Sequence, residues 1–191
     1  MTTSARENRR AFAVWLTGLP SSGKSSIARA LAARLRERGF DPAVLESDAL
    51  RSVLTPNPTY SDQERDTFYG AMLHIGRLLV EHDVPVIFDA TANRRRYRDA
   101  ARTVIARFFE VYVATPLDVC AARDPKGLYR AANDRGERAN QTPSALPGVG
   151  ATYEPPLNAE VRIDTQVQDP DAAAHAIVAA LTKRGWLGGW R

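Results

Sequence analysis

The sequence feature that most constrains this chain is the stretch from Gly18 to Ser25, which reads Gly-Leu-Pro-Ser-Ser-Gly-Lys-Ser. It is a complete match to the pattern G-x-x-x-x-G-K-[ST], and it directly follows the apolar run 12–16. A buried strand that leads through such a loop into a helix lets backbone N–H groups and the positive end of the helix dipole converge on a polyphosphate. In this pattern Lys24 reaches the β- and γ-phosphates, and the Ser25 hydroxyl holds Mg²⁺. The alternative is a chance turn rich in glycine and serine, and the strand before it and helical rhythm after it argue against that.

Apolar strands and amphipathic helices alternate along the rest of the chain. Short apolar runs predict strands at 12–16, 43–45, 84–88, 110–113 and 161–164. Helical periodicity predicts helices over 25–38, 62–82, 96–107 and 170–183. Near-continuous apolar strands that alternate with helices indicate a parallel sheet with helices on both faces. The predicted fold is therefore α/β, a three-layer P-loop NTPase fold with a five-stranded parallel sheet and a lid segment.

Ligands of such sheets bind beyond the carboxyl ends of the strands. Several candidate residues follow those ends, and we expect them to share one rim: the loop 18–25, Asp48, Asp89 and 115–117. Residues 124–158 are dense in Pro, Gly, Asn and Arg. A structureless loop of that length is uncommon in a compact domain unless it is functional. We therefore interpret 124–158 as a lid that closes on nucleotide and acceptor, with an ordinary disordered insertion as the alternative.

Length and composition limit the class of protein. A chain of 191 residues, of which 44% are hydrophobic, is long enough for one well-packed domain and short for two. We expect a domain over 11–184 that includes the lid, a flexible N-terminal tail over 1–10 and a C-terminal tail over 185–191. The single cysteine, Cys120, excludes an intrachain disulfide, and no apolar stretch has the length of a signal peptide or a membrane span. We expect a cytoplasmic protein with no membrane partner.

The charge pattern favours small anionic ligands. The formal net charge is +4, and the arginines are spread along the chain apart from a cluster at 94–96. Nucleotides account for that cluster at least as well as nucleic acid does, so we do not expect a nucleic-acid partner. The sequence is compatible with a homodimer and does not choose among oligomeric states.

A phosphate loop alone does not separate switches, hydrolases and kinases. The guanine-reading sequence N-K-x-D is absent from this chain, and motor-type ATPases are usually longer, which leaves small-molecule kinases. A kinase needs a metal-bound polyphosphate and a carboxylate that orients or deprotonates the acceptor hydroxyl. Asp48, with Arg51 one helical turn later, is the candidate carboxylate, and a helix N-cap is its alternative role. Asp89 is a candidate to bind Mg²⁺ through water, to contact the acceptor or to cap the next helix.

Three blocks of sequence together resemble the adenylylsulfate kinase family. They are the phosphate loop, Leu-Glu-Ser-Asp-Ala-Leu-Arg at 45–51 and Cys-Ala-Ala-Arg-Asp-Pro-Lys-Gly-Leu-Tyr at 120–129. Segments 153–156 and 161–165 continue the similarity, which covers roughly residues 11–182. The resemblance implies Mg²⁺-dependent transfer of the γ-phosphoryl group of ATP to the ribose 3′-hydroxyl of adenylyl sulfate (APS). The products would be ADP and the phosphorylated sulfate donor PAPS, and the process would be sulfate assimilation.

The motif and the resemblance together predict a set of site residues. The nucleotide-binding residues are Gly18, Leu19, Pro20, Ser21, Ser22, Gly23, Lys24, Ser25 and Ser26. The catalytic residues are Asp48 and Lys24, and the metal ligands are Ser25 and Asp48, with Asp89 as a candidate through water. The acceptor-binding residues are Asp48, Arg51, Tyr60, Arg65, Thr91, Lys126 and Leu146. Tyr60 is placed to stack on the acceptor base, and a solvent-exposed or core tyrosine is its alternative role.

The chain departs from the family's pattern at three places. Phe68 stands where the family commonly has an Asn after its Asp-Arg pair, and the arginines that follow are lost. The family's Ile-Ser-Pro turn is replaced by Thr-Ala-Asn at 91–93, and Leu146 lies where Phe-Thr-Gly is expected. Each lost hydrogen bond to a charged ligand costs about 1.5–3 kcal/mol, which is enough to change the preferred acceptor. Two alternatives stay open: a related kinase for a hydroxyl of another nucleotide-like or specialised metabolite, and a non-catalytic nucleotide-binding or nucleic-acid-binding module.

Overall fold

The computed structural model describes residues 11–136 and 145–187. The strands are β1 (Ala13–Thr17), β2 (Ala43–Glu46), β3 (Val86–Asp89), β4 (Phe108–Val113) and β5 (Val161–Ile163). The helices are α2 (Lys24–Arg36), α3 (Ser47–Leu54), α4 (Asp62–Glu81), α5 (Arg95–Val104), α6 (Leu117–Arg123), α7 (Leu128–Gly136) and α8 (Pro170–Lys183). The expected N-terminal tail, part of the expected lid and the last four residues lie outside the described ranges.

The five strands form one parallel sheet in the order β2-β3-β1-β4-β5. The central strand β1 pairs with β3 through Leu16 and Asp89, and with β4 through Thr17 and Tyr112. Because β1 has a neighbour on each side, the loop that follows it opens at the middle of the carboxyl edge of the sheet. This is where ligands bind in open parallel sheets.

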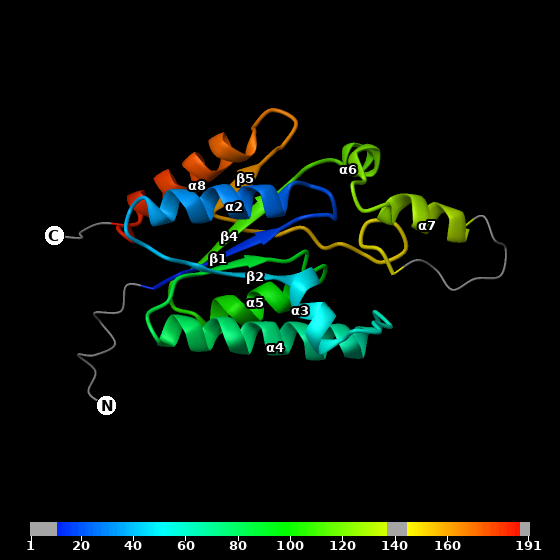
Figure 1. Cartoon of the computed structure of the whole chain (residues 1–191), viewed down its shortest axis with the longest axis horizontal. Coiled ribbons are helices and arrows are strands. Elements are labelled where there is room, and N and C mark those ends of the chain that lie inside the picture. The colour runs from blue at the N-terminus through cyan, green and yellow to red at the C-terminus, as the bar shows by residue number, and fades with distance from the viewer. Residues whose placement is uncertain (1–10, 137–144, 188–191) are drawn as a thin grey trace.

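Helices cover both faces of the sheet, as Figure 1 shows: α2 and α8 lie on one face, and α4 and α5 lie on the other. The two layers follow from the alternation of side chains along β1. Phe12, Val14 and Leu16 point into the core beneath α2 and α8. Ala13 and Trp15 point into the core beneath α4 and α5. The predicted three-layer α/β fold is confirmed, and within the described ranges no helix is both long and apolar enough to cross a bilayer.

The structure corrects the expectation that 124–158 is irregular throughout. Helix α7 occupies Leu128–Gly136 within that segment. Tyr129 and Ala132, one turn apart, are buried on one face of this helix, and the Asp124 carboxylate accepts a hydrogen bond from the backbone N–H of Arg130. The polar composition of the segment hid a short helix that buries Tyr129 and Ala132 and leaves Leu128 and Ala131 exposed.

The C-terminal end of the described chain packs on the core. The ring of Trp186 lies 6.1 Å from that of Phe12 and 6.1 Å from that of Phe109. Trp186 therefore packs on the core of its own domain. The second tryptophan of the tail, Trp190, lies outside the described residues.

Candidate functional site

The phosphate loop connects β1 to α2, and its two glycines are required by geometry. Gly23 precedes α2 with φ +102°, a conformation that side chains with a Cβ rarely adopt. At Gly18 an added Cβ would lie 2.4 Å from the carbonyl oxygen of Val113, so only glycine fits against β4. The loop can adopt this shape only with glycine at both positions: Gly18 leaves room for β4, and Gly23 takes the backbone conformation that begins α2.

Hydroxyl groups from distant parts of the chain support the loop from behind. The Oγ1 atoms of Thr115 and Thr165 lie 3.0 and 3.1 Å from the Ser22 carbonyl oxygen. The Tyr129 hydroxyl donates to the carbonyl of Pro20 at 2.9 Å. Sequence reasoning placed 115–117 on the rim but missed these supporting roles, because single threonines and tyrosines carry no pattern of their own. The only available signal was their position just after β4 and β5 and in the block at 120–129.

Lys24 is buried in the loop and folds back on it. Its Nζ atom donates to the carbonyl of Gly18 at 3.0 Å and to that of Leu19 at 2.7 Å. Burial lowers the pKa of Lys24 from 10.5 to about 8, against the opposing effect of the nearby carboxylates of Asp89 and Asp48. The cation is therefore destabilised until an anion approaches it, which is the property expected of a phosphate-binding lysine.

This burial predicts an unusual stability effect for Lys24→Met. The pKa near 8 in the folded protein lies below the 10.5 of an unfolded chain, so the unfolded state binds more protons between these values. The contribution of this site to stability therefore rises with pH through that window, and below it the buried cation costs roughly 3 kcal/mol. We expect the variant, without ligand, to be more stable than the parent at pH 7 by about 1–3 kcal/mol, since the hydrogen bonds lost with the amine offset part of the gain.

Urea unfolding at pH 7 and pH 10 measures this difference. The advantage of the variant should shrink at pH 10, where the parent amine is neutral in the folded state. The exposed Lys183, in the last turn of α8, supplies the control: Lys183→Met should not gain stability in this pH-dependent way. A Lys24→Met protein less stable than the parent at pH 7 would contradict the prediction.

Carboxylates and a second lysine gather beside the loop. Asp48 lies in the first turn of α3, and its side chain forms an ion pair with Lys126. Hydrogen bonding to Asp48 raises the pKa of Lys126. Asp89 ends β3 and is buried. The residue at the N-cap position of α3 is Glu46, so the N-cap alternative for Asp48 is wrong, and its carboxylate faces the lid lysine instead.

The oxygen atoms near Lys24 fit a magnesium ion better than a metal that needs a closed protein shell. No group of three or more His, Cys, Asp or Glu residues suited to a metal occurs in the described ranges. Ser25, Asp48 and Asp89, the predicted metal residues, would offer one hydroxyl and two carboxylates. Mg²⁺ is typically held by one or two carboxylates, with phosphate oxygens and water completing the shell.

Arg51 occupies a niche of aromatic and acidic side chains between α3 and α4. Its guanidinium carbon lies 3.9 Å from the ring centre of Phe68 and 5.1 Å from that of Tyr60. Its NH1 group lies 3.2 Å from Glu64 Oε1. Burial opposes ionisation of Glu64, but hydrogen bonds from Thr59 and Tyr60 together with the Arg51 charge hold its pKa below the usual value. These contacts hold the guanidinium of Arg51, the residue predicted to bind the acceptor, in one orientation.

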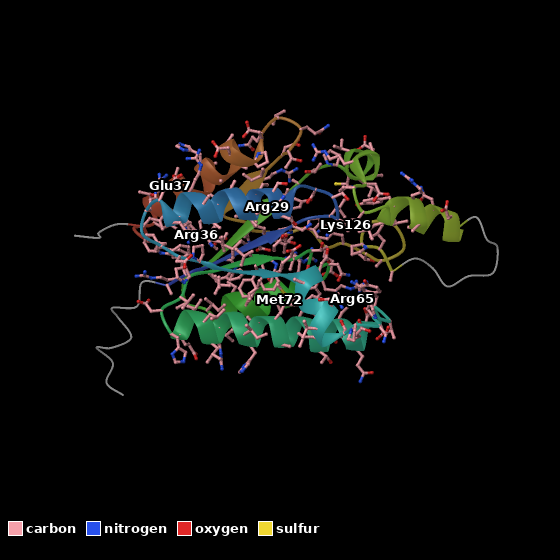
Figure 2. The ribbon with its side chains drawn as sticks, in the orientation of Figure 1. Arg29, Arg36, Glu37, Arg65, Met72 and Lys126 are labelled. Atoms are coloured by element: carbon pink, nitrogen blue, oxygen red, sulfur yellow. The ribbon has the colours of Figure 1, made fainter. Side chains whose placement is uncertain are left out.

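Arg65 is buried, and its donors reach three separate segments. It donates to the carbonyl of Tyr60 at 3.0 Å, to Asn93 Oδ1 at 3.3 Å and to the carbonyl of Ala145 at 2.7 Å. Figure 2 shows Arg65 and Lys126 toward the end of the molecule where α6 and α7 lie, whereas Arg36 and Glu37 mark the other end of α2. Arg65 therefore connects α4 to the segment 124–158.

The remaining predicted acceptor residues line the same rim with different exposure. Tyr60 is 42% exposed, so it is a surface side chain and not a core one. Its backbone has φ +55°. Thr91 accepts a hydrogen bond at its carbonyl from the Thr17 hydroxyl at 2.6 Å. Leu146 accepts at its carbonyl from the backbone N–H groups of 149–151, and the turn so formed rests on the loop, because an added Cβ at Gly148 would lie 2.7 Å from Leu19.

The cluster 94–96, which the charge pattern assigned to a nucleotide at least as readily as to nucleic acid, contacts carboxylates of the protein itself. Arg94 and the backbone N–H of Arg95 both contact the Glu154 carboxylate. Arg96 pairs with Asp66. These contacts tie the start of α5 to the segment that leaves the lid and to α4.

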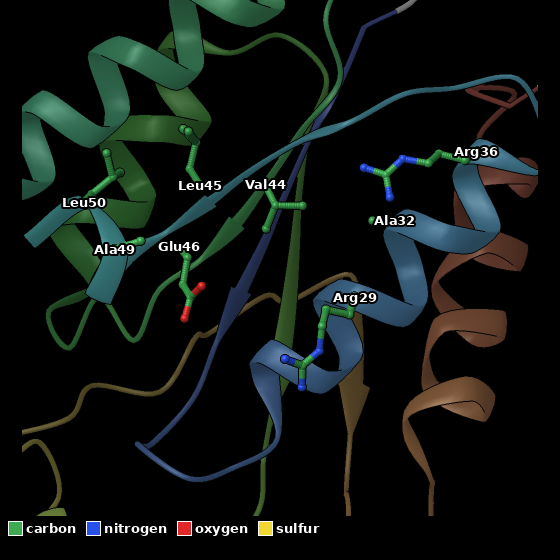
Figure 3. Close-up of a pocket in the computed structure, with 8 residues that line it drawn as sticks. All are labelled: Arg29, Ala32, Arg36, Val44, Leu45, Glu46, Ala49 and Leu50. Atoms are coloured by element: carbon green, nitrogen blue, oxygen red, sulfur yellow. The ribbon is translucent and has the colours of Figure 1, made fainter. Parts of the chain in front are cut away.

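A hollow of about 540 Å³ lies between α2 and the corner of β2 and α3 (Figure 3). Arg29 and Arg36 stand on its α2 side, and Val44 and Glu46 lie on the opposite side. None of the predicted nucleotide, acceptor or metal residues lines it. The hollow is thus a separate surface feature, and the phosphate site is defined by the loop itself.

Comparison with known proteins shows which family this chain resembles. The model of the adenylylsulphate kinase family matches residues 10–164. A probable adenylyl-sulfate kinase of Pyrococcus abyssi is 37% identical over 176 residues, which is 92% of this chain and 98% of the relative. The adenylyl-sulfate kinase of Gloeothece citriformis is 38% identical over 179 residues, covering 94% of this chain and 98% of the relative.

A solved structure extends the similarity to three dimensions. The Mycobacterium tuberculosis APS kinase CysC, in complex with AMPPNP and APS, superimposes with a TM-score of 0.81 and 34% identity. The match covers 91% of this chain and 98% of that one. With the family model matching most of the chain and relatives similar over nearly their whole length, this chain belongs to the adenylyl-sulfate kinase family.

Proposed function

We propose that this protein transfers the γ-phosphoryl group of ATP to the 3′-hydroxyl of adenylyl sulfate, giving PAPS and ADP. The observation that carries the proposal is the meeting of Lys24 with the pair Asp48 and Lys126 at one rim of the sheet. The likeness to a kinase solved with AMPPNP and APS supports the choice of acceptor. The proposal places the protein in sulfate assimilation in the cytoplasm.

On the donor side, the backbone of 18–25 and the N-terminus of α2 bind the phosphates. Lys24 turns from the carbonyls of Gly18 and Leu19 to the phosphate oxygens, where its charge offsets the charge that develops during transfer. Mg²⁺, when held by Ser25 and Asp48 and through water by Asp89, supplies further stabilisation of that charge.

On the acceptor side, Asp48 accepts a hydrogen bond from the 3′-hydroxyl and orients its oxygen toward the γ-phosphorus. The new bond forms between that oxygen and phosphorus as the bond to the β–γ bridging oxygen breaks; ADP leaves, and the hydroxyl proton passes to Asp48. As the lid closes, Lys126 leaves its ion pair with Asp48 and binds an anionic group of the substrates instead. Arg51, Tyr60, Arg65, Thr91 and Leu146 form the remaining acceptor surface in this proposal.

The test is an acceptor screen with Mg-ATP in which ADP release is measured. We expect ADP release that depends on adenylyl sulfate, and much slower release with AMP, which carries the same 3′-hydroxyl without the sulfate. No turnover above background with adenylyl sulfate would remove the substrate claim.

A related kinase that acts on a different hydroxyl is the second candidate. The specific observation in its favour is Phe68, whose ring lies under Arg51 at the position where a polar side chain is expected. In the same screen, faster turnover with another nucleotide-like acceptor than with adenylyl sulfate would favour this candidate.

A further inference from the structure

Phe68 lies in α4 with its side chain 1% exposed. Its ring meets that of Tyr69 edge-on, with centroids 5.3 Å apart. The opposite partner is a cation: the guanidinium carbon of Arg51 stands 3.9 Å from the Phe68 ring centre, closer than to the rings of Tyr60 or Tyr69. At this distance the planar guanidinium is in contact with the face of the ring.

The same guanidinium is also held at one edge. Glu64, one helical turn before Phe68, accepts a hydrogen bond from the NH1 group of Arg51 at 3.2 Å. The Glu64 carboxylate also accepts hydrogen bonds from the hydroxyl and the backbone N–H of Thr59, which hold it in place. An arginine stacked on a ring keeps the N–H donors in its own plane, so it can bind an anion edge-on while its face remains covered. Phe68 and Glu64 therefore determine the plane in which Arg51 offers its charge.

We propose that Phe68 is a specificity-determining residue of the acceptor site, because its ring holds Arg51 in the orientation that binds the anionic group of a nucleotide acceptor. This inference rests on the proposed function. Phe68 has no polar atom with which to contact the acceptor, so recognition at this position passes through Arg51. Losing the ring weakens acceptor binding and leaves the donor half of the site intact, because Phe68 lies on α4, across the sheet from the helix α2 that follows the loop.

The decisive variant is Phe68→Leu, which keeps a buried apolar side chain and removes the ring. We expect the KM for adenylyl sulfate to rise roughly five- to twentyfold, the range of a partly desolvated cation–π contact, with kcat and the KM for ATP within about twofold of the parent. Phe109→Leu is the matched control, since Phe109 is fully buried in the other core layer. It should leave the acceptor KM unchanged.

A double-mutant cycle shows whether Phe68 acts through Arg51. In an Arg51→Lys background, which keeps the charge without the planar guanidinium, Phe68→Leu should change the acceptor KM by less than about twofold. An unchanged acceptor KM in Phe68→Leu alone, or an equal loss in the Arg51→Lys background, would overturn the proposal. A fall in kcat together with a rise in the KM values for both substrates would also overturn it, because that pattern indicates that Phe68 only packs in the core.

A readout independent of turnover separates this inference from the proposed function. In the NMR spectrum of the parent, the Arg51 side-chain resonances should show an upfield ring-current shift. Phe68→Leu should reduce this shift strongly, because Phe68 is nearer to the guanidinium than Tyr60 or Tyr69, and Phe109→Leu should preserve it. A parent without activity on adenylyl sulfate overturns the proposed function. A parent without this shift overturns the role of Phe68, whatever the activity.

Discussion

Asp48→Ala is expected to lower kcat by about 10²- to 10⁴-fold, the usual contribution of a positioned acid–base group. Asp48 is the carboxylate that joins the loop side of the site to the lid through Lys126. Its side chain is 62% exposed, so folding stability should change by less than about 0.5 kcal/mol. Steady-state kinetics of ADP release, together with urea unfolding, measure both quantities.

The matched control is Asp62→Ala. Asp62 is also an exposed aspartate in the first turn of a helix, α4, and no ion pair holds it in the described structure. Its replacement should leave kcat unchanged. An Asp48→Ala protein that releases ADP as fast as the parent would contradict the role of Asp48 and would favour a nucleotide-binding module without positioned carboxylate chemistry.

Glu110→Gln is expected to lower the free energy of unfolding by about 3–5 kcal/mol, because it leaves a buried cation without its carboxylate. The partner is Arg98, whose side chain is 1% exposed and whose Nε lies 2.8 Å from Glu110 Oε1. Arg98 also donates to the carbonyls of Ala92 and Glu154. The pair therefore joins β4 and α5 to the segment that leaves the lid.

Equilibrium urea unfolding measures this loss, and the slope of the transition shows whether two-state behaviour is kept. Asp41→Asn is the control, since the pair of Arg36 and Asp41 is largely exposed, and its urea midpoint should stay close to that of the parent. A Glu110→Gln protein as stable as the Asp41→Asn protein would show that Arg98 is satisfied by backbone carbonyls alone.

The fold and the donor half of the site were predictable because their determinants are local. Periodic apolar residues placed the strands and helices within a few positions, and the confirmed sheet follows from their alternation. Boundaries were less accurate where a turn intervened. The third strand begins at Val86 and not at 84, because the N–H of Val84 closes a turn onto Leu79 and Pro85 has no N–H to donate.

The supports of the site were not predictable from the sequence, because they join residues far apart in the chain. Asp48 and Lys126 are 78 residues apart, and Arg65 meets the carbonyl of Ala145 across 80 residues. No spacing rule relates such partners. Helix α7 was missed for the same reason: its stability comes from the burial of Tyr129 and its hydrogen bond to Pro20, 109 residues earlier.

The sequence by itself determined the sheet, the phosphate loop and the donor chemistry. Apolar periodicity and the need for glycine at positions 18 and 23 are properties of neighbouring residues, which act over one or two turns. Only the tertiary structure decided how the acceptor side is built. It stacks Phe68 against Arg51 and joins Arg65 to the carbonyl of Ala145 by a hydrogen bond. It also places Glu46, and not Asp48, at the N-cap of α3. Stacking, burial and ion pairing depend on which elements meet in space, and packing alone determines that.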